Sequence, residues 1–154
     1  MAKVIDRKKM GEPGEYGIGF ASRAVKDDYE HAFVIWYYTD PKGKRTVRRG
    51  AGFYPAGTID KAYDLILGTS GKVYDDSKEK IKKELIVLVS RNDFDHARAV
   101  ESRYADGKTY RVALSDCTTF VQEVAESVPG LAVPSRLQFP YPTNFIARMH
   151  DIND

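Results

Sequence analysis

The hydrophobic residues of this chain follow two spacings, one typical of strands and one typical of helices. Segments rich in β-branched and aromatic residues predict strands at residues 17–25, 31–38 and 45–54, and a short apolar run predicts another at 85–89. Turn residues at 40–44 join the second and third segments into a hairpin. The nearly continuous apolar run at 31–38 indicates a strand in the middle of the sheet.

Helical spacing occurs in two later segments. Ser90 is a suitable N-cap for a helix over residues 91–104. A second helix follows Ser115 or Asp116, either of which can cap it, so Cys117 lies in its first turn. Its apolar residues form one stripe: Phe120, Val121, Val124, Ala125 and Val128.

Two regions show neither spacing. Residues 56–77 are loop-like, with strand fragments around 63–67, and form a candidate flap over a site. Residues 132–145 are rich in proline and aromatic residues, and we expect them either to wrap a site or to pack as a C-terminal extension. The pattern predicts an α+β fold in which a central antiparallel sheet packs against the helix bearing Cys117, in a single domain spanning residues 1–154.

Composition narrows the possible partners. The 154 residues are 42% hydrophobic and 30% charged, as in one globular domain, and the net charge of +2 predicts no particular partner. The basic residues form no dense patch within a recognisable module, so we expect no nucleic-acid binding. We expect no membrane span, because no run approaches the ~18 apolar residues that a span needs. The basic N-terminus lacks the apolar segment of a signal peptide, which makes the cytoplasm the default location, with delivery to another cell or the periplasm without a Sec signal as the alternative.

The chain holds one cysteine and three histidines, which give no metal-ligand spacing. We therefore expect no metal and no cofactor, and Gly17 and Gly19 lack the third glycine of a dinucleotide-binding motif. His96, in a charged helix start, and His150, near the C-terminus, are predicted to be solvated. His31 differs because it opens the most hydrophobic predicted strand.

Cys117 has the position of a nucleophile. A structural cysteine is expected within the apolar stripe of the helix, whereas Cys117 follows a polar Ser-Asp pair at the helix start. Free backbone N–H groups and the positive end of the helix dipole lower the pKa of a thiol there and can donate to an oxyanion. A thiol nucleophile needs a base, and His31 is the candidate.

His31 at the start of a central strand, followed by Asp116, Cys117 and Phe120 at the start of a helix, resembles the circularly permuted branch of the papain-like superfamily. That branch includes permuted NlpC-type peptidases and lecithin:retinol acyltransferase relatives. The resemblance covers residues 17–146 and implies a permuted papain-like fold, with Cys117 as nucleophile and His31 as its base. Asp116 stands where relatives often carry Asn.

The resemblance also implies a third polar residue that orients the histidine, near the far end of the next strand. A hairpin turning at residues 42–43 places Tyr54 opposite His31, so Tyr54 is predicted as the third catalytic residue. Thr58 and Asp60 in the following loop are alternatives. Substrate-binding positions are expected at Asp116, Thr118 and Trp36.

The activity that this resemblance implies is that of a cysteine-dependent hydrolase working through a thioester. The resemblance implies an amidase, peptidase or deamidase that takes a peptide, amide or acyl substrate. We expect such an enzyme to act as a bacterial effector or on the cell wall, with a cognate inhibitor or immunity protein. Two alternatives stay open: a thiol acyltransferase or phospholipase of the same fold, and a non-catalytic binding or immunity protein.

Overall fold

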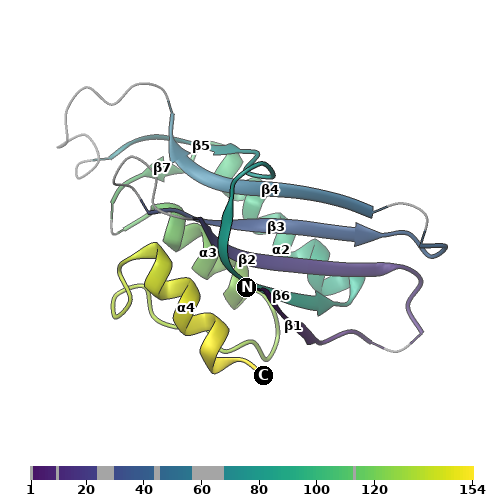
Figure 1. The fold of residues 1–154 in the computed structure, drawn as a ribbon. Helices are drawn as coiled ribbons and strands as arrows, with labels where there is room; N and C mark the ends of the chain where they lie inside the picture. The colour runs from purple at the N-terminus through teal and green to yellow at the C-terminus, as the bar shows by residue number, and fades with distance from the viewer. Residues whose placement is uncertain (1, 10, 24–29, 44–45, 57–67, 113) are drawn as a thin grey trace.

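The computed structural model describes residues 2–9, 11–23, 30–43, 46–56, 68–112 and 114–154. These residues form a mixed α+β fold of a seven-stranded sheet and three helices (Figure 1). The strands are β1 (Ala2–Asp6), β2 (Glu15–Arg23), β3 (Ala32–Thr39), β4 (Thr46–Pro55), β5 (Thr69–Tyr74), β6 (Ile81–Val89) and β7 (Thr109–Tyr110). The helices are α2 (Arg91–Ala105), α3 (Cys117–Glu126) and α4 (Pro142–Ile152).

The strands lie in the order β1-β6-β2-β3-β4-β5-β7, and all neighbours are antiparallel except the parallel pair β1 and β6. The four strands predicted from the sequence are β2, β3, β4 and β6, and β3 lies in the middle of the sheet as its apolar run indicated. In the hairpin, Val34 is opposite Ala51. Continuing this register to the residue before β3 places His31 opposite Tyr54, as predicted.

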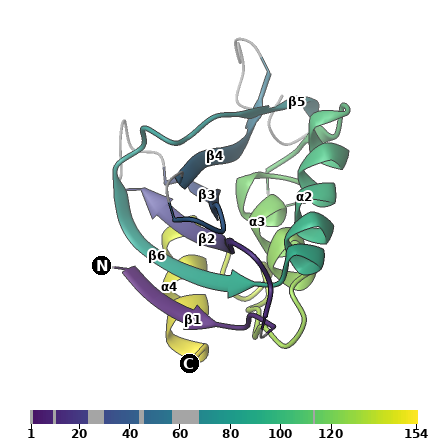
Figure 2. The same ribbon diagram turned by 90° about the vertical axis from the view of Figure 1, so that its right-hand side faces the viewer.

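The main hydrophobic core lies between the sheet and the helices. Helix α2 begins after Ser90, whose hydroxyl accepts the Asp93 N–H at 3.2 Å, so the predicted cap is confirmed. Helix α3 buries the predicted apolar stripe against β3 and β4. Figure 2 shows α2 and α3 side by side on one flank of the curved sheet, with α4 beneath β2 and β6.

Three elements differ from the sequence prediction. The N-terminal residues form strand β1, and part of the region predicted as a loop forms strand β5. The proline-rich tail contains helix α4, because Pro142 occupies the first helical position, where no N–H is needed. Phe145 and Met149 of α4 are fully buried in the main core. The strand fragments expected at 63–67 lie outside the described residues.

The connection from β5 to β6 lies across β4 because two residues of β4 lack side chains. A Cβ at Gly50 would stand 2.4 Å from backbone atoms of Asp76 and Ser77. The Asp75 carboxylate secures this crossing by accepting the N–H groups of Gly50 at 3.2 Å and Ser77 at 2.9 Å. Glycine within a strand is typical of such close backbone approach. The crossing brings Asp76 over the sheet beside His31.

Candidate active site

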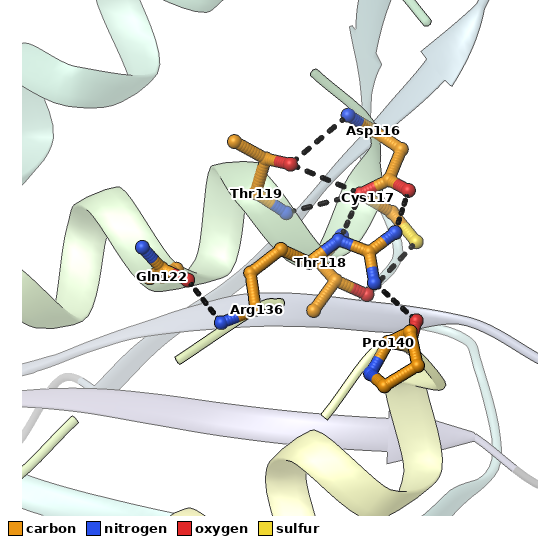
Figure 3. Close-up of polar contacts among 7 residues, drawn as sticks. All are labelled: Asp116, Cys117, Thr118, Thr119, Gln122, Arg136 and Pro140. Atoms are coloured by element: carbon orange, nitrogen blue, oxygen red, sulfur yellow. Dashed lines mark hydrogen bonds and ion pairs between the residues drawn. The ribbon is translucent and has the colours of Figure 1, made fainter. Parts of the chain in front are cut away.

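Cys117 is the first residue of α3, as predicted, and it is 6% exposed. The helix start is fixed by Asp116, whose Oδ1 accepts the N–H groups of Thr118 and Thr119, both at 3.1 Å (Figure 3). The Thr119 hydroxyl in return accepts the Asp116 N–H at 3.3 Å, which completes a capping box. This reciprocal pair holds the backbone of the nucleophile.

His31 lies directly before β3, is 3% exposed, and contacts both Cys117 and Asp76. Its Nε2 is 2.8 Å from Oδ2 of Asp76. The His31 ring also interacts with the Cys117 thiol, and because Asp76 occupies Nε2, Nδ1 is the ring nitrogen left for this contact. The backbone N–H of Ala32 also donates to the sulfur. The three side chains form a Cys-His-Asp arrangement of the kind that can supply a nucleophile, a base and an orienting carboxylate.

The electrostatics of this arrangement favour the charged pair. Burial lowers the pKa of His31, but the hydrogen bonds and charges of Asp76 and Cys117 outweigh it and raise the pKa to about 9. Burial raises the pKa of Cys117, but its hydrogen bond and charge interaction with His31 outweigh burial, and the pKa is lowered. Both shifts favour the thiolate–imidazolium form of the pair over the neutral form.

Asp76 is the site residue that the sequence analysis missed. A Cβ at Gly52 would stand 1.8 Å from Oδ2 of Asp76 and 2.7 Å from Nε2 of His31, so the carboxylate occupies space that only glycine leaves free. The signal in the sequence is the pair of glycines, Gly50 and Gly52, on one face of a strand beside the histidine-bearing strand. The other two candidates for this role, at positions 58 and 60, lie outside the described residues.

Tyr54 lies next to His31, but its role differs from the predicted one. Its ring stacks on the imidazole, with 4.3 Å between ring centroids and 27° between planes. Its hydroxyl donates to Oδ1 of Asp76 at 2.7 Å, not to the histidine. Burial, followed by the interaction with Asp76, raises the pKa of Tyr54, so the phenol keeps the proton that it donates. Tyr54 is thus a positioning residue, and the third member of the arrangement is Asp76.

The residues predicted to bind substrate are buried: Asp116 and Thr118 beside Cys117, and Trp36 farther along β3. Trp36 is 2% exposed and packs edge-on against Phe94 of α2 at 5.5 Å, about 16 Å along β3 from His31. Thr118 is fully buried, with its hydroxyl 3.9 Å from the Cys117 sulfur. Asp116 is occupied by the helix cap and by an ion pair with Arg136. Each of these side chains is held by the protein itself, and their contact with a substrate stays a prediction.

Tyr110 is a second residue that the sequence analysis missed. Burial, followed by the charges of Cys117 and Asp116, raises the pKa of the Tyr110 phenol, which lies near the start of α3. The N–H groups of Thr118 and Thr119 are bound by Asp116, so they are not free as the sequence analysis expected. The groups beside the sulfur that can donate to an oxyanion are the Cys117 N–H and the Tyr110 hydroxyl. The pairing of β7 with β5 and a tight turn between Arg111 and Ser115 bring Tyr110 here.

The other two histidines lie away from Cys117 on the surface of their helices. His96 is exposed on α2, as predicted. The prediction for His150 is wrong: its side chain is only 16% exposed, and its Nδ1 lies 3.2 Å from Asp151. Within the described residues no cluster of His, Cys, Asp and Glu side chains is placed to hold a metal ion. None of the described helices is long and apolar enough to cross a bilayer.

Comparisons with known proteins were made for the family, for curated relatives and for structural neighbours. No family model, no curated protein and no solved structure matches the chain. The functional argument therefore depends on the geometry of the site.

Proposed function

We propose that this chain is a cysteine-dependent hydrolase of the permuted papain-like type, with Cys117 as nucleophile, His31 as acid and base, and Asp76 as the carboxylate that orients His31. The observation that carries the proposal is the contact between Asp76 Oδ2 and His31 Nε2 at 2.8 Å, with Cys117 bonded to the same imidazole. A core cysteine needs no oriented imidazole and no buried carboxylate. The order His31, Asp76, Cys117 along the chain supports the permuted form of the fold.

In the proposed reaction, the Cys117 thiolate attacks the carbonyl carbon of an amide or ester, and the electron pair of the C=O bond moves to oxygen. The N–H of Cys117 and the hydroxyl of Tyr110 stabilise the resulting oxyanion. The imidazolium of His31 donates its proton to the leaving amine or alcohol as the tetrahedral intermediate collapses to a thioester.

In the second step, water attacks the thioester while His31 accepts its proton, and the acid product and the Cys117 thiolate are released. Asp76 holds the imidazole in one orientation and stabilises its positive charge throughout. An amine or alcohol in place of water makes the same site an acyltransferase. That alternative shares every residue of the first step.

The experiment is alkylation of Cys117 by iodoacetamide across pH 5 to 9, because Cys117 is the only cysteine of the chain. For the folded wild-type protein we expect a midpoint well below the ordinary thiol pKa of about 8.5. His31→Ala is expected to return the midpoint to the ordinary range, and Asp76→Ala to shift it part of the way. His96→Ala is the matched control, since His96 is exposed and lies on α2, away from the site.

Because Cys117 is buried, the same experiment also distinguishes the proposed hydrolase from a non-catalytic binding protein of this fold. If the folded protein resists alkylation while the unfolded chain reacts, the thiol is a buried structural group and the proposal fails. Reaction at the ordinary pH midpoint, unchanged by His31→Ala, also removes the imidazole from the mechanism. A low midpoint that depends on His31 supports the hydrolase, and its substrates can then be searched among amides and acyl esters.

A further inference from the structure

A buried ion pair joins the start of α3 to the segment before α4. The Arg136 guanidinium contacts Oδ2 of Asp116 through Nη2, and the side chains of the pair are only 10% and 8% exposed. The other terminal nitrogen, Nη1, donates to the Pro140 carbonyl, and the Arg136 backbone N–H donates to Oε1 of Gln122 at 2.8 Å. Figure 3 shows the guanidinium between Asp116 and Pro140, next to Cys117.

Asp116 thereby has two separate tasks, one for each carboxylate oxygen. Oδ1 caps α3, and Oδ2 binds Arg136. A cap does not need a charge, because the neutral Asn side chain caps helices as well as Asp does. The charge of Asp116 is therefore not needed for the cap, and it disfavours the thiolate form of the next residue, Cys117. Burial and the negative charge of Asp116 both act to raise the pKa of the Cys117 thiol, against the lowering effect of His31.

The titratable groups that face Cys117 come from three directions. His31 precedes β3, Asp116 precedes α3 itself, and Tyr110 belongs to β7. Of these, only Asp116 is a carboxylate. Arg136 is the cation bound to it, and a guanidinium stays protonated over the whole range in which a thiol titrates.

We infer that Arg136 is a positioning residue for the nucleophile: it neutralises the capping carboxylate beside Cys117 and fastens the segment 136–140 against the helix start. This role depends on the proposed function, because it matters only if Cys117 acts as a thiolate. The ion pair compensates for the charge of Asp116 while leaving its capping geometry intact. Removing the arginine alone leaves the thiolate beside a buried carboxylate that has lost its guanidinium.

The test compares the pH midpoint of iodoacetamide alkylation in folded wild type, Arg136→Met, Asp116→Asn and the double variant. Arg136→Met is expected to raise the midpoint by about one pH unit and to slow alkylation at pH 6.5 by about tenfold. The double variant is expected to recover a midpoint close to that of wild type, since Asn retains the cap and has no charge. Asp116→Asn alone is expected to fall below wild type, and Arg136→Lys to rescue most of the shift.

Arg91→Met is the matched control, because Arg91 is an exposed arginine paired with Asp95 at the start of α2. An unchanged midpoint in folded Arg136→Met, or a double variant that stays as slow as the single one, overturns the inference and makes the ion pair purely structural. If Arg136→Met does not fold, Asp116→Asn decides: a midpoint at or above the wild-type value overturns the inference. A wild-type midpoint near 8.5 is a different failure, because it removes the proposed function before any variant is compared.

Discussion

Replacing Gly52 by alanine adds a single methyl group and should separate Asp76 from His31. The added Cβ would stand 1.8 Å from Oδ2 of Asp76, whereas non-bonded heavy atoms pack at about 3.5 Å or more. The carboxylate must therefore retreat by more than one ångström. That movement breaks its 2.8 Å contact with His31, since the same Cβ also stands 2.7 Å from Nε2. Gly52 needs no left-handed backbone, so the effect comes from space alone.

The size of the effect follows from the groups that Gly52→Ala separates. A hydrogen bond to a charged partner contributes about 1.5–3 kcal/mol, and overpacking a filled interior destabilises by about 1–3 kcal/mol. Without Asp76, the pKa of His31 falls from about 9, because burial is then opposed only by the interaction with Cys117, and less imidazolium remains to stabilise the thiolate. A thiol with the ordinary pKa of about 8.5 is roughly 1% ionised at pH 6.5. Alkylation of Cys117 should then slow by ten- to a hundredfold.

The assay for Gly52→Ala combines iodoacetamide alkylation at pH 6.5, an NMR titration of the His31 imidazole and urea unfolding. Gly17→Ala is the control, because Gly17 also lies within a strand of the same sheet and its Cβ would meet side-chain atoms at an ordinary 3.4 Å. The reasoning is refuted if folded Gly52→Ala keeps both the wild-type alkylation rate and the raised pKa of His31. Loss of reactivity in Gly17→Ala to the same extent would show that any added methyl group in the sheet has this effect.

Three further predictions follow from other contacts. Tyr54→Phe keeps the ring against His31 but removes the donor to Asp76, so we expect the free energy of urea unfolding to fall by about 1 kcal/mol. The alkylation rate of Cys117 should fall less than in Tyr54→Ala, which also loses the ring, and equal falls in the two variants would contradict this. Burial raises the pKa of the Glu84 carboxyl above its ordinary value of 4.5, so the folded state favours the protonated form and this group lowers stability as the pH rises past that value. Glu84→Gln, which stays neutral, should therefore gain stability relative to wild type between pH 4 and pH 7 in denaturant unfolding, and a constant difference would contradict this. Expression in the cytoplasm of a bacterial host should harm the cells if the substrate is a protein or small amide, and expression in the periplasm should harm them if it is peptidoglycan. Cys117→Ala should abolish the harm. Harm that persists in that variant would exclude catalysis as its cause.

The sequence predicted the parts of the site that local patterns encode. The start of α3 was predicted because a capping residue and an apolar stripe at helical spacing both lie within a few residues of Cys117. The register that places Tyr54 opposite His31 followed from the turn at residues 42–43. Both inferences concern segments that are close along the chain, where the rules of capping and strand pairing apply directly.

The rest of the site depends on contacts between distant segments. Asp76 reaches His31 only because β5 pairs with β4 and the chain then crosses the two glycines of β4. Arg136 reaches Asp116 from 20 residues away, from a turn that follows α3. Trp36 was expected to bind substrate, but the packing of α2 buries it. Spacing along the chain contains none of this information.

The two described ends of the chain lie close together. The order in which the reacting groups occur along the chain can therefore be changed while the fold is kept. The Lys3 ammonium contacts the backbone carbonyls of His150 and Asn153 and lies 3.6 Å from the Asp154 carboxylate, and both ends lie together in Figures 1 and 2. A short linker could therefore join them, and the chain could be reopened at Gly107, an exposed residue of the turn between α2 and β7. The rearranged gene would encode the cysteine helix first, then the histidine strand and then the aspartate. If the site depends only on which surfaces pack together, the thiol of that protein will titrate as it does in the natural order.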